Sequence, residues 1–163
     1  MKLDKLVINA SPIISLAKID CAGFLLKISS NLVIPEGVAQ EILCCTHQDA
    51  AVKWISAKHL QELILPVEVP AIISEWNLGK GESQVIAFAL QHRNCTAGID
   101  DRAAKKCAEV FDIKVSGTIS FLIKAKMMGL TPKVAPLFSA LRINGFRVSE
   151  EILKAALQIV NED

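Results

Sequence analysis

Short apolar runs alternate along the chain with longer segments in which apolar residues recur at helical spacing. The apolar runs predict strands at residues 6–8, 32–34, 63–65, 95–99 and 114–116. The longer segments predict helices around 13–17, 36–45, 50–57, 82–91, 104–111 and 118–128, and two more that begin at 131 and 149. Strands that alternate with helices form βαβ units, so the pattern predicts an α/β fold with a mainly parallel sheet of about five strands.

The first helix carries a start signal of its own. Ser11 is followed by Pro12, which predicts Ser11 as the N-cap and Pro12 at the first helical position. Ser149, directly before Glu150, marks the start of the last helix in the same way.

The hydrophobic fraction is 52%, which favours a sheet with helices on both faces, because such strands have no solvated side. No apolar run reaches the ~18 residues that a membrane span needs. Asp4 and Lys5 interrupt any signal-peptide core near the N-terminus. We therefore expect a three-layer α/β/α sandwich, formed as one cytoplasmic domain over residues 1–163 and independent of a membrane.

The formal net charge is only +1, so any surface that binds nucleic acid must be a local one. Aromatic residues make up 5% of the chain and tyrosine is absent, which argues against platforms for stacking many bases. The charge balance thus disfavours a protein that grips a long duplex through its phosphates.

The five cysteines form an odd set without a C-x-x-C pair, which indicates free thiols in a reducing compartment. Cys44, Cys45 and His47 are conceivable metal ligands. Adjacent residues on a helix point about 100° apart, however, and no second ligand pair follows. We therefore expect core or surface thiols rather than a structural metal site.

Polar residues follow several predicted strands, at the edge where parallel sheets bind their ligands. The positions are Asn9 and Ser11 after the first strand, Asp100 and Asp101 after the fourth, Glu82 after a glycine turn, and Glu41 on the helix after the second strand. Carboxylates that converge repel one another unless a cation neutralises them, and oxygen ligands favour Mg²⁺ or Mn²⁺. Such an ion suits the hydrolysis of a phosphodiester, as in a nuclease.

Each of these residues also has a purely structural interpretation. Ser11 can simply cap its helix, and Glu82 in a first helical turn favours the macrodipole. Asp100 and Asp101 can be strand-end and N-cap residues, and Glu41 can lie on a solvated helix face. These residues are informative only when they are taken together and in their order along the chain.

Five blocks of the sequence carry a resemblance to a known family. They are Val-Ile-Asn-Ala-Ser-Pro-Ile-Ile (7–14), Val-Ile-Pro-Glu-Gly-Val-Ala-Gln-Glu-Ile (33–42), Leu-Gly-Lys-Gly-Glu-Ser (78–83), Ile-Asp-Asp-Arg-Ala-Ala (99–104) and Val-Ser-Gly-Thr (115–118). Together they resemble PIN-like proteins, most closely the branch related to VapC toxins. The resemblance implies a parallel sheet flanked by helices, Mg²⁺ or Mn²⁺ held by clustered carboxylates, and cleavage of RNA.

By position, Glu41, Glu82 and one or both of Asp100 and Asp101 match the acidic residues of the family. Ser11 matches the hydroxyl that supports the first acidic position. That first position normally holds Asp, and here it is Asn9. Asparagine keeps a carbonyl oxygen that can reach a metal, but it lacks the unit charge and cannot act as a base.

Basic residues lie beside the candidate carboxylates. Lys80, Arg102, Lys105 and Lys106 are expected to meet RNA phosphates, or else to form a solvated helix face. A nucleotide loop at residues 79–83 is rejected, because the Walker spacing is absent and Glu82 would repel a phosphate.

Two functions of different classes follow. The first is a ribonuclease of the toxin–antitoxin kind, with a cognate antitoxin and a homodimer whose interface uses 50–57 and 131–141. The second is a catalytically silent PIN fold that binds RNA or a partner protein without cutting; Asn9 favours it. A flavodoxin-like ligand binder is a third possibility, but residues 9–12 lack the glycines and hydroxyls of a phosphate loop.

Overall fold

The fold is built on a five-stranded parallel sheet with the strand order β3-β2-β1-β4-β5. The computed structural model describes residues 2–44 and 49–162. The strands are β1 (Lys5–Ile8), β2 (Leu32–Pro35), β3 (Ile64–Leu65), β4 (Cys95–Gly98) and β5 (Lys114–Ser116). All neighbouring strands pair in parallel, as the alternation of strands and helices predicts.

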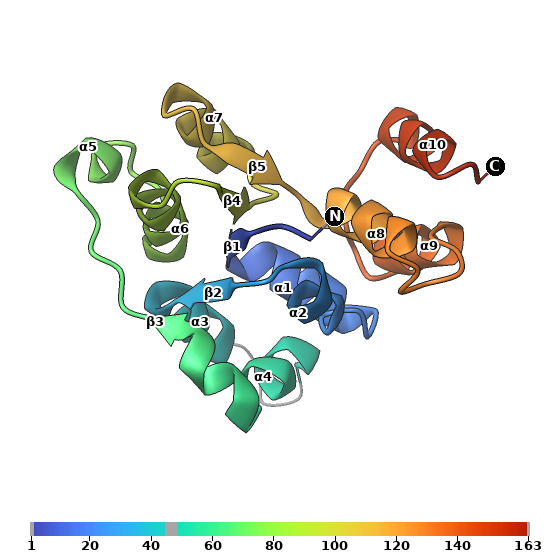
Figure 1. Cartoon of the computed structure of the whole chain (residues 1–163), viewed down its shortest axis with the longest axis horizontal. Helices are drawn as coiled ribbons and strands as arrows, with labels where there is room; N and C mark the ends of the chain where they lie inside the picture. The colour runs from blue at the N-terminus through green and yellow to red at the C-terminus, as the bar shows by residue number, and fades with distance from the viewer. Residues whose placement is uncertain (1, 45–48, 163) are drawn as a thin grey trace.

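Helices cover both faces of the sheet. They are α1 (Ala10–Lys18), α2 (Phe24–Ile28), α3 (Glu36–Leu43), α4 (Ala50–Ile55), the 3-10 helix η1 (Lys58–Leu63), α5 (Ala71–Ser74), α6 (Lys80–Gln91), α7 (Arg102–Val110), α8 (Thr118–Met127), α9 (Ala135–Ile143) and α10 (Glu150–Ile159). In Figure 1, α6 and α7 lie on one side of the strands, while α1, α2 and α8 lie on the other. The arrangement is a three-layer α/β/α sandwich, in agreement with the predicted fold class.

The central strands form the core. Leu6, Val7 and Ile8 of β1 are fully buried, and Ala97 of β4 is buried beside them. Strands that are covered on both faces read as continuous apolar runs, which is why these segments are recognisable in the sequence. Among the described residues, no helix is both long enough and apolar enough to cross a membrane.

The sequence misplaced two helix starts. The helix α1 begins at Ala10 with Asn9 as its N-cap, so the assignment of Ser11 to the N-cap and Pro12 to the first helical position is wrong. Pro12 still lies in the first turn, where its missing N–H costs no helical hydrogen bond. The helix α9 begins at Ala135 rather than at 131, whereas α10 begins after Ser149 as predicted.

The cysteines in the described part of the chain are free thiols. Cys21, Cys95 and Cys107 are buried, and Cys44 is exposed. Burial raises the pKa of Cys95 to about 11, so this thiol stays protonated and acts as a small apolar side chain. The alternative metal site at residues 44–47 includes two positions, 45 and 47, that lie outside the described residues.

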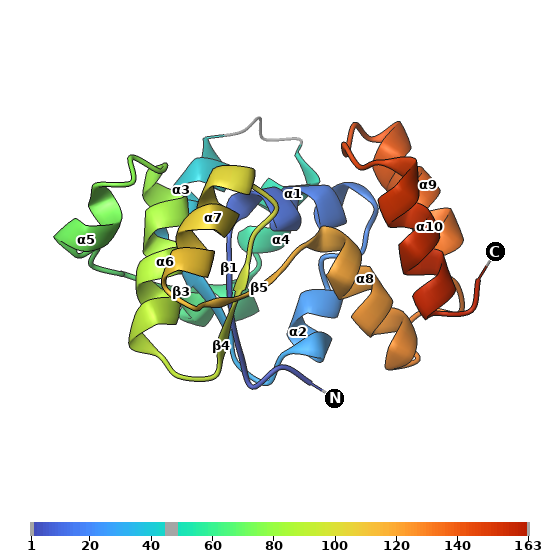
Figure 2. The same ribbon diagram turned by 90° about the horizontal axis from the view of Figure 1, so that it is seen from above.

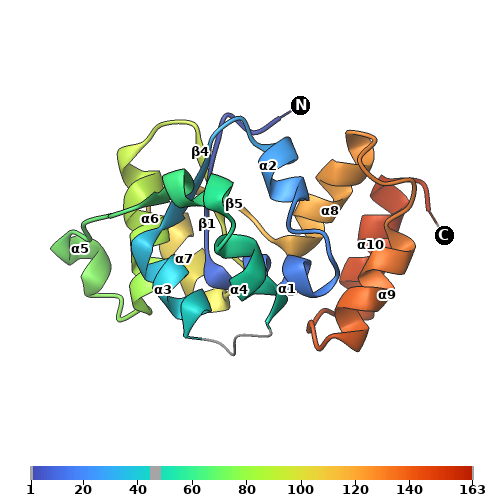
Figure 3. The same cartoon turned by 90° about the horizontal axis from the view of Figure 1, so that it is seen from below.

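The C-terminal helices α9 and α10 lie together at one end of the molecule, beyond α8 (Figure 2). The view from below places them on the side of α1 and α8, away from α5 and α6 (Figure 3). Contacts of α9 with α1 and of α10 with α8 attach this pair to the sandwich.

Candidate active site

The carboxyl ends of β1, β4 and β5 meet at one level of the sheet. Ile8 is paired with Gly98, and Gly98 with Ser116, so the residues that follow these strands emerge side by side. The N–H of Asn9 donates to Gly98 O at 2.9 Å, and the N–H of Ile99 donates to Ser116 O at 3.0 Å. The strand order changes direction between β1 and β4, which is where open parallel sheets form their ligand crevice.

Asn9 occupies this crevice as a buried polar residue with 3% of its surface exposed. Its backbone caps α1, but its side chain makes no capping hydrogen bond. Its Oδ1 atom is buried and has no hydrogen-bond partner among the described residues. Leaving such an acceptor unsatisfied costs about 1–3 kcal/mol, so the position is suited to an external donor or a cation.

Asp100 is held in place by Thr118. The Thr118 N–H donates to Oδ1 of Asp100 at 2.9 Å, and the Thr118 hydroxyl donates to Oδ2 at 2.6 Å. A side chain at Gly117 would collide with this arrangement, because its Cβ would lie 2.7 Å from Asp100 Oδ1. The blocks at 99–104 and 115–118 thus meet in space, and the second fixes the carboxylate of the first.

Asp101 and Glu82 each stabilise the start of a helix. Oδ2 of Asp101 accepts a hydrogen bond from the Ala104 N–H at 2.8 Å, so Asp101 is the N-cap of α7. Oε2 of Glu82 accepts from the Gly79 N–H at 3.1 Å in the first turn of α6. Both structural interpretations of these residues are therefore realised in the geometry, and each carboxylate retains a second oxygen.

Glu41 lies on α3, on the same side of the site as Glu82. Loss of hydration raises the pKa of Glu41, and the negative charge of Glu82 raises it further. A Cβ at Gly81 would lie 3.3 Å from Glu41 Oε2, which shows how closely α3 approaches the start of α6. A carboxylate whose ionisation is disfavoured by a neighbouring negative charge is a favourable setting for a cation.

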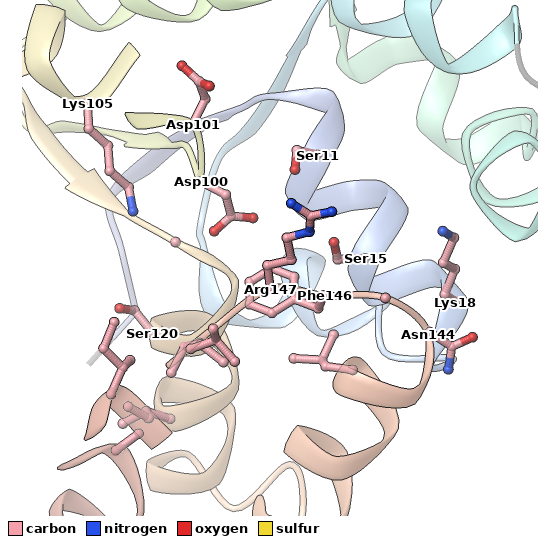
Figure 4. Close-up of a pocket in the computed structure, with 18 of the residues that line it drawn as sticks. Ser11, Ser15, Lys18, Asp100, Asp101, Lys105, Ser120, Asn144, Phe146 and Arg147 are labelled. Carbon is pink, nitrogen blue, oxygen red and sulfur yellow. The ribbon is translucent and has the colours of Figure 1, made fainter. Parts of the chain in front are cut away.

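A pocket with a volume of about 830 Å³ opens beside these residues. Its polar edge contains Glu82, Asp100 and Asp101, together with Ser11 and Lys105. Figure 4 shows Asp100, Asp101 and Lys105 on one side of the pocket, facing Ser11 and Ser15 of α1. Asn9 and Glu41 are adjacent to the site but do not line the pocket.

The predicted basic residues are distributed unevenly. Lys105 lines the pocket, whereas Lys80, Arg102 and Lys106 lie outside its lining. The Nζ of Lys80 donates to Gln40 Oε1 at 2.8 Å, a contact that ties the start of α6 to α3. Only one of the four is therefore positioned to contact a ligand in the pocket itself.

A comparison with protein families bears directly on this geometry. The model of one family, described as DUF3368, PIN domain, matches residues 5–162. The chain belongs to the PIN domain family. A PIN domain has a nuclease-type fold, and the match includes the strand ends and helix starts that carry the acidic residues. No curated protein matches the chain.

Among the described residues of this PIN domain, no three His, Cys, Asp or Glu side chains converge into a metal-binding group. The reason is visible in the hydrogen bonds: Thr118 holds Asp100, while Asp101 and Glu82 turn toward backbone N–H groups. The donors nevertheless have the right chemistry, since all are oxygens and Asn9 Oδ1 is unpartnered.

Several residues of the site were not assigned from the sequence. Thr118 belongs to the block 115–118 and opens a predicted helix, but the sequence assigns it no role in the site, although its position after β5, next to β4, marks the same sheet edge. Lys18, Phe146 and Arg147 line the pocket as well. Nothing in the local sequence around 146 and 147 points to the site, because the packing of α9 against α1 brings them there.

Proposed function

We propose that this PIN domain is a metal-dependent endoribonuclease that uses Mg²⁺ or Mn²⁺. The observation that carries the proposal is one pocket lined by Glu82, Asp100 and Asp101 at the switch point of a parallel sheet. Family membership supports the same conclusion, because the fold is of the nuclease type.

Five residues would hold the cation. They are Asn9, Glu41, Glu82, Asp100 and Asp101, which offer one amide and four carboxylate oxygens. When bound, the ion supplies positive charge against a phosphodiester and makes water a better nucleophile at neutral pH. Two features of the chain favour its binding: Oδ1 of Asn9 has no partner among the described residues, and the negative charge of Glu82 lies close to Glu41.

The remaining residues position these ligands and the substrate. Thr118 orients Asp100 through two hydrogen bonds, and Ser11 contributes a hydroxyl to the pocket edge. Lys105 is the basic residue placed to meet a phosphate in the pocket. Lys80, Arg102 and Lys106 would contact phosphates farther along the RNA.

The biological setting that we propose is a toxin–antitoxin pair in the cytoplasm. The resemblance of the five sequence blocks to the VapC-related branch supports it, and it implies a small cognate antitoxin. We further propose that residues 1–163 form one domain that assembles as a homodimer. The extent of the family match, which includes α9 and α10, supports the single domain.

A second function is favoured by one observation, the amide at position 9. With Asn9 in place of the first Asp, the site lacks one unit of negative charge. A PIN fold weakened in this way would bind RNA or a partner protein without cleaving it.

Cleavage of mixed RNA by the pure protein, with Mn²⁺, with Mg²⁺ and with EDTA, tests both functions. A nuclease cuts with either metal and stops with EDTA, and Glu82→Gln or Asp100→Asn abolishes its activity. Glu75→Gln is the matched control, because Glu75 is exposed and does not line the pocket. RNA that stays intact under all three conditions would exclude the nuclease and favour the silent fold.

A further inference from the structure

The pocket extends well beyond the acidic residues, between α1, α8 and the C-terminal pair α9–α10. Its apolar lining is formed by Ile119, Ile123, Leu141, Ile152, Ala156 and Ile159. Its rim is polar and carries the hydroxyls of Ser11, Ser15 and Ser120. A volume of about 830 Å³ falls in the range of small-molecule sites, and the mixture of surfaces suits an amphipathic ligand.

The connection between α9 and α10 places Phe146 and Arg147 in this pocket. A tight turn fixes them: the Phe146 N–H donates to Leu141 O at 3.0 Å, and the Gly145 N–H donates to Arg142 O at 3.0 Å. Gly145 adopts φ +89°, the left-handed conformation that ends a helix in this way. The side chains that follow are thus held by the backbone rather than left on an open loop.

Arg147 is an available cation at the acidic edge. Its exposed guanidinium points toward Ser11 and Asp100 (Figure 4). Lys18 and Lys105 also line the pocket, and none of these three cations forms an ion pair with a described residue. The pocket thus carries three cations beside three carboxylates, and a cation bound by these carboxylates, as proposed above, would leave a site that attracts an anionic ligand.

Phe146 adds an aromatic surface directly beside Arg147. It is half-buried against the core, and among the described residues it is the only aromatic side chain that lines the pocket. An aromatic ring next to an arginine fork is a combination that binds a base by stacking and its phosphate by paired hydrogen bonds. The serine hydroxyls on the rim offer partners for a ribose.

We propose that this pocket binds one unpaired nucleotide of the RNA, next to the phosphate that is cut. Phe146 stacks on the base of this nucleotide, and Arg147 binds the nucleotide's own phosphate rather than the one that is cut. The RNA must be single-stranded there, because only an unpaired base is free to leave its stack. The proposal rests on the proposed nuclease function for the position of the cut. A hydrophobic peptide segment is the competing occupant; it would use the apolar lining of the pocket but none of its three cations.

The test is the binding of a fluorescently labelled single-stranded RNA of mixed sequence, measured by anisotropy with EDTA and with Ca²⁺. Arg147→Ala should weaken binding about tenfold, and Arg147→Lys less, because lysine keeps the charge but not the fork. Phe146→Leu, which keeps an apolar side chain, should weaken binding about fivefold. Melting curves of all variants establish that each one folds.

Arg142→Ala is the matched control, because Arg142 lies in the last turn of α9, close to the connection, but pairs with Glu150 and does not line the pocket. It should change RNA binding by less than about twofold. If folded Arg147→Ala and Phe146→Leu bind RNA as wild type does, or if wild type binds no RNA, the nucleotide site is wrong. If the pocket instead binds a hydrophobic peptide, the two variants should bind RNA as wild type does.

Failure of the nuclease proposal looks different. In that case the wild type binds RNA but never cuts it, and both substitutions still weaken binding. This result would support the nucleotide site and contradict the nuclease function. If the protein does cut RNA, Arg147→Ala and Phe146→Leu should raise KM more than they lower kcat, because both contacts lie outside the scissile bond.

Discussion

Asn9 is the most informative residue of the site, because it is only 3% exposed and yet its side-chain carbonyl oxygen has no hydrogen-bond partner among the described residues. A fold tolerates such an acceptor where another component completes it. A cation at the end of β1 would do so, and the neighbouring carboxylates make that the most favourable position for positive charge.

Asn9→Asp should therefore increase both metal binding and cleavage. Without metal, the new charge should lower the free energy of unfolding by about 1–2 kcal/mol, because it joins a group of like charges. With Mn²⁺, the melting temperature should rise more in the variant than in wild type, since a bound ligand stabilises by mass action. Thermal melts with and without Mn²⁺, run beside RNA cleavage assays, measure both effects.

Asn94→Asp is the control for charge alone. Asn94 is exposed, lies far along the chain at the turn before β4, and has a positive φ of 61° that Asp tolerates equally well. It should not alter the Mn²⁺-induced shift. Equal shifts in wild type and Asn9→Asp, with rapid cleavage by both, would show that position 9 is not a metal ligand.

Thr118 has the opposite character, since all of its side chain is buried and its hydroxyl is satisfied by Asp100. Thr118→Val keeps the shape but leaves Asp100 Oδ2 without its donor. We expect the free energy of unfolding to fall by about 1–3 kcal/mol and cleavage to fall with it, because Asp100 loses its orientation. Thr131→Val, which removes an exposed hydroxyl, should change stability little; a similar loss in both variants would contradict the special role of Thr118.

At the scale of elements, the turn after α9 decides where Phe146 and Arg147 lie. Gly145→Ala should lower the free energy of unfolding by about 1–2 kcal/mol, because φ +89° is unfavourable for an L side chain even though the space around it is open. Gly23→Ala is the control: Gly23 has φ −59° and also has open space, so alanine there should be neutral or stabilising. Chemical denaturation of both variants measures the difference.

The start of α9 depends on a residue near the end of the chain. The Val134 N–H donates to both carboxylate oxygens of Glu162 at 3.0 Å, and the Ala135 N–H donates to Oε2 at 2.9 Å. These backbone hydrogen bonds, above all the one from Ala135, lower the pKa of Glu162, and Lys126 at 3.3 Å lowers it further. The folded protein therefore holds the ionised form more tightly than the unfolded chain does.

Because the pKa is lowered on folding, this stabilisation is complete above the ordinary value of 4.5 and is lost as the pH falls through the lower, folded value. Glu162→Gln should reduce the melting temperature at neutral pH and should have progressively less effect in acid below about pH 4.5. Glu151→Gln, at an exposed position on α10, is the control. A deficit of the Glu162 variant that does not change with pH would contradict the assignment.

The sheet and its order of elements could be predicted from the sequence because buried parallel strands produce continuous apolar runs. Short helices such as α2 (Phe24–Ile28) and α5 (Ala71–Ser74) could not, since four or five residues show no period. The start of α9 was misplaced for a different reason. Its N-terminal N–H groups are satisfied by Glu162, a tertiary contact that no local capping signal announces.

The placement of Glu82, Asp100 and Asp101 at the pocket could be predicted because each follows a strand or opens a helix at one sheet edge, whereas Glu41 lies near the end of α3 and does not line the pocket. The C-terminal part could not, because Arg147 reaches the pocket only through the packing of α9 and α10 on the sandwich. Thr118 lies between these cases: its block was recognised, but its hydrogen bonds to Asp100 depend on the register of β4 against β5.

At the scale of the whole molecule, the two segments expected at a dimer interface already use much of their apolar surface within the chain. Ala51, Val52 and Ile55 of α4 are buried, as are Phe138 and Leu141 of α9. Apolar surface remains exposed at the end of α9, where 85% of Ile143 is accessible, the largest exposed fraction among the large apolar residues of the described chain. The proposed homodimer would therefore involve the end of α9.

Ile143→Glu tests the dimer, because a charge at the centre of an apolar interface would have to be buried without a partner. Light scattering at micromolar concentration should give the mass of two chains for wild type and of one chain for the variant. Val110→Glu is the matched control, since Val110 is 65% exposed but belongs to α7, on the other side of the sheet, and it should remain dimeric. A wild type with the mass of one chain would contradict the homodimer, and a dimeric Ile143→Glu would exclude α9 as its interface.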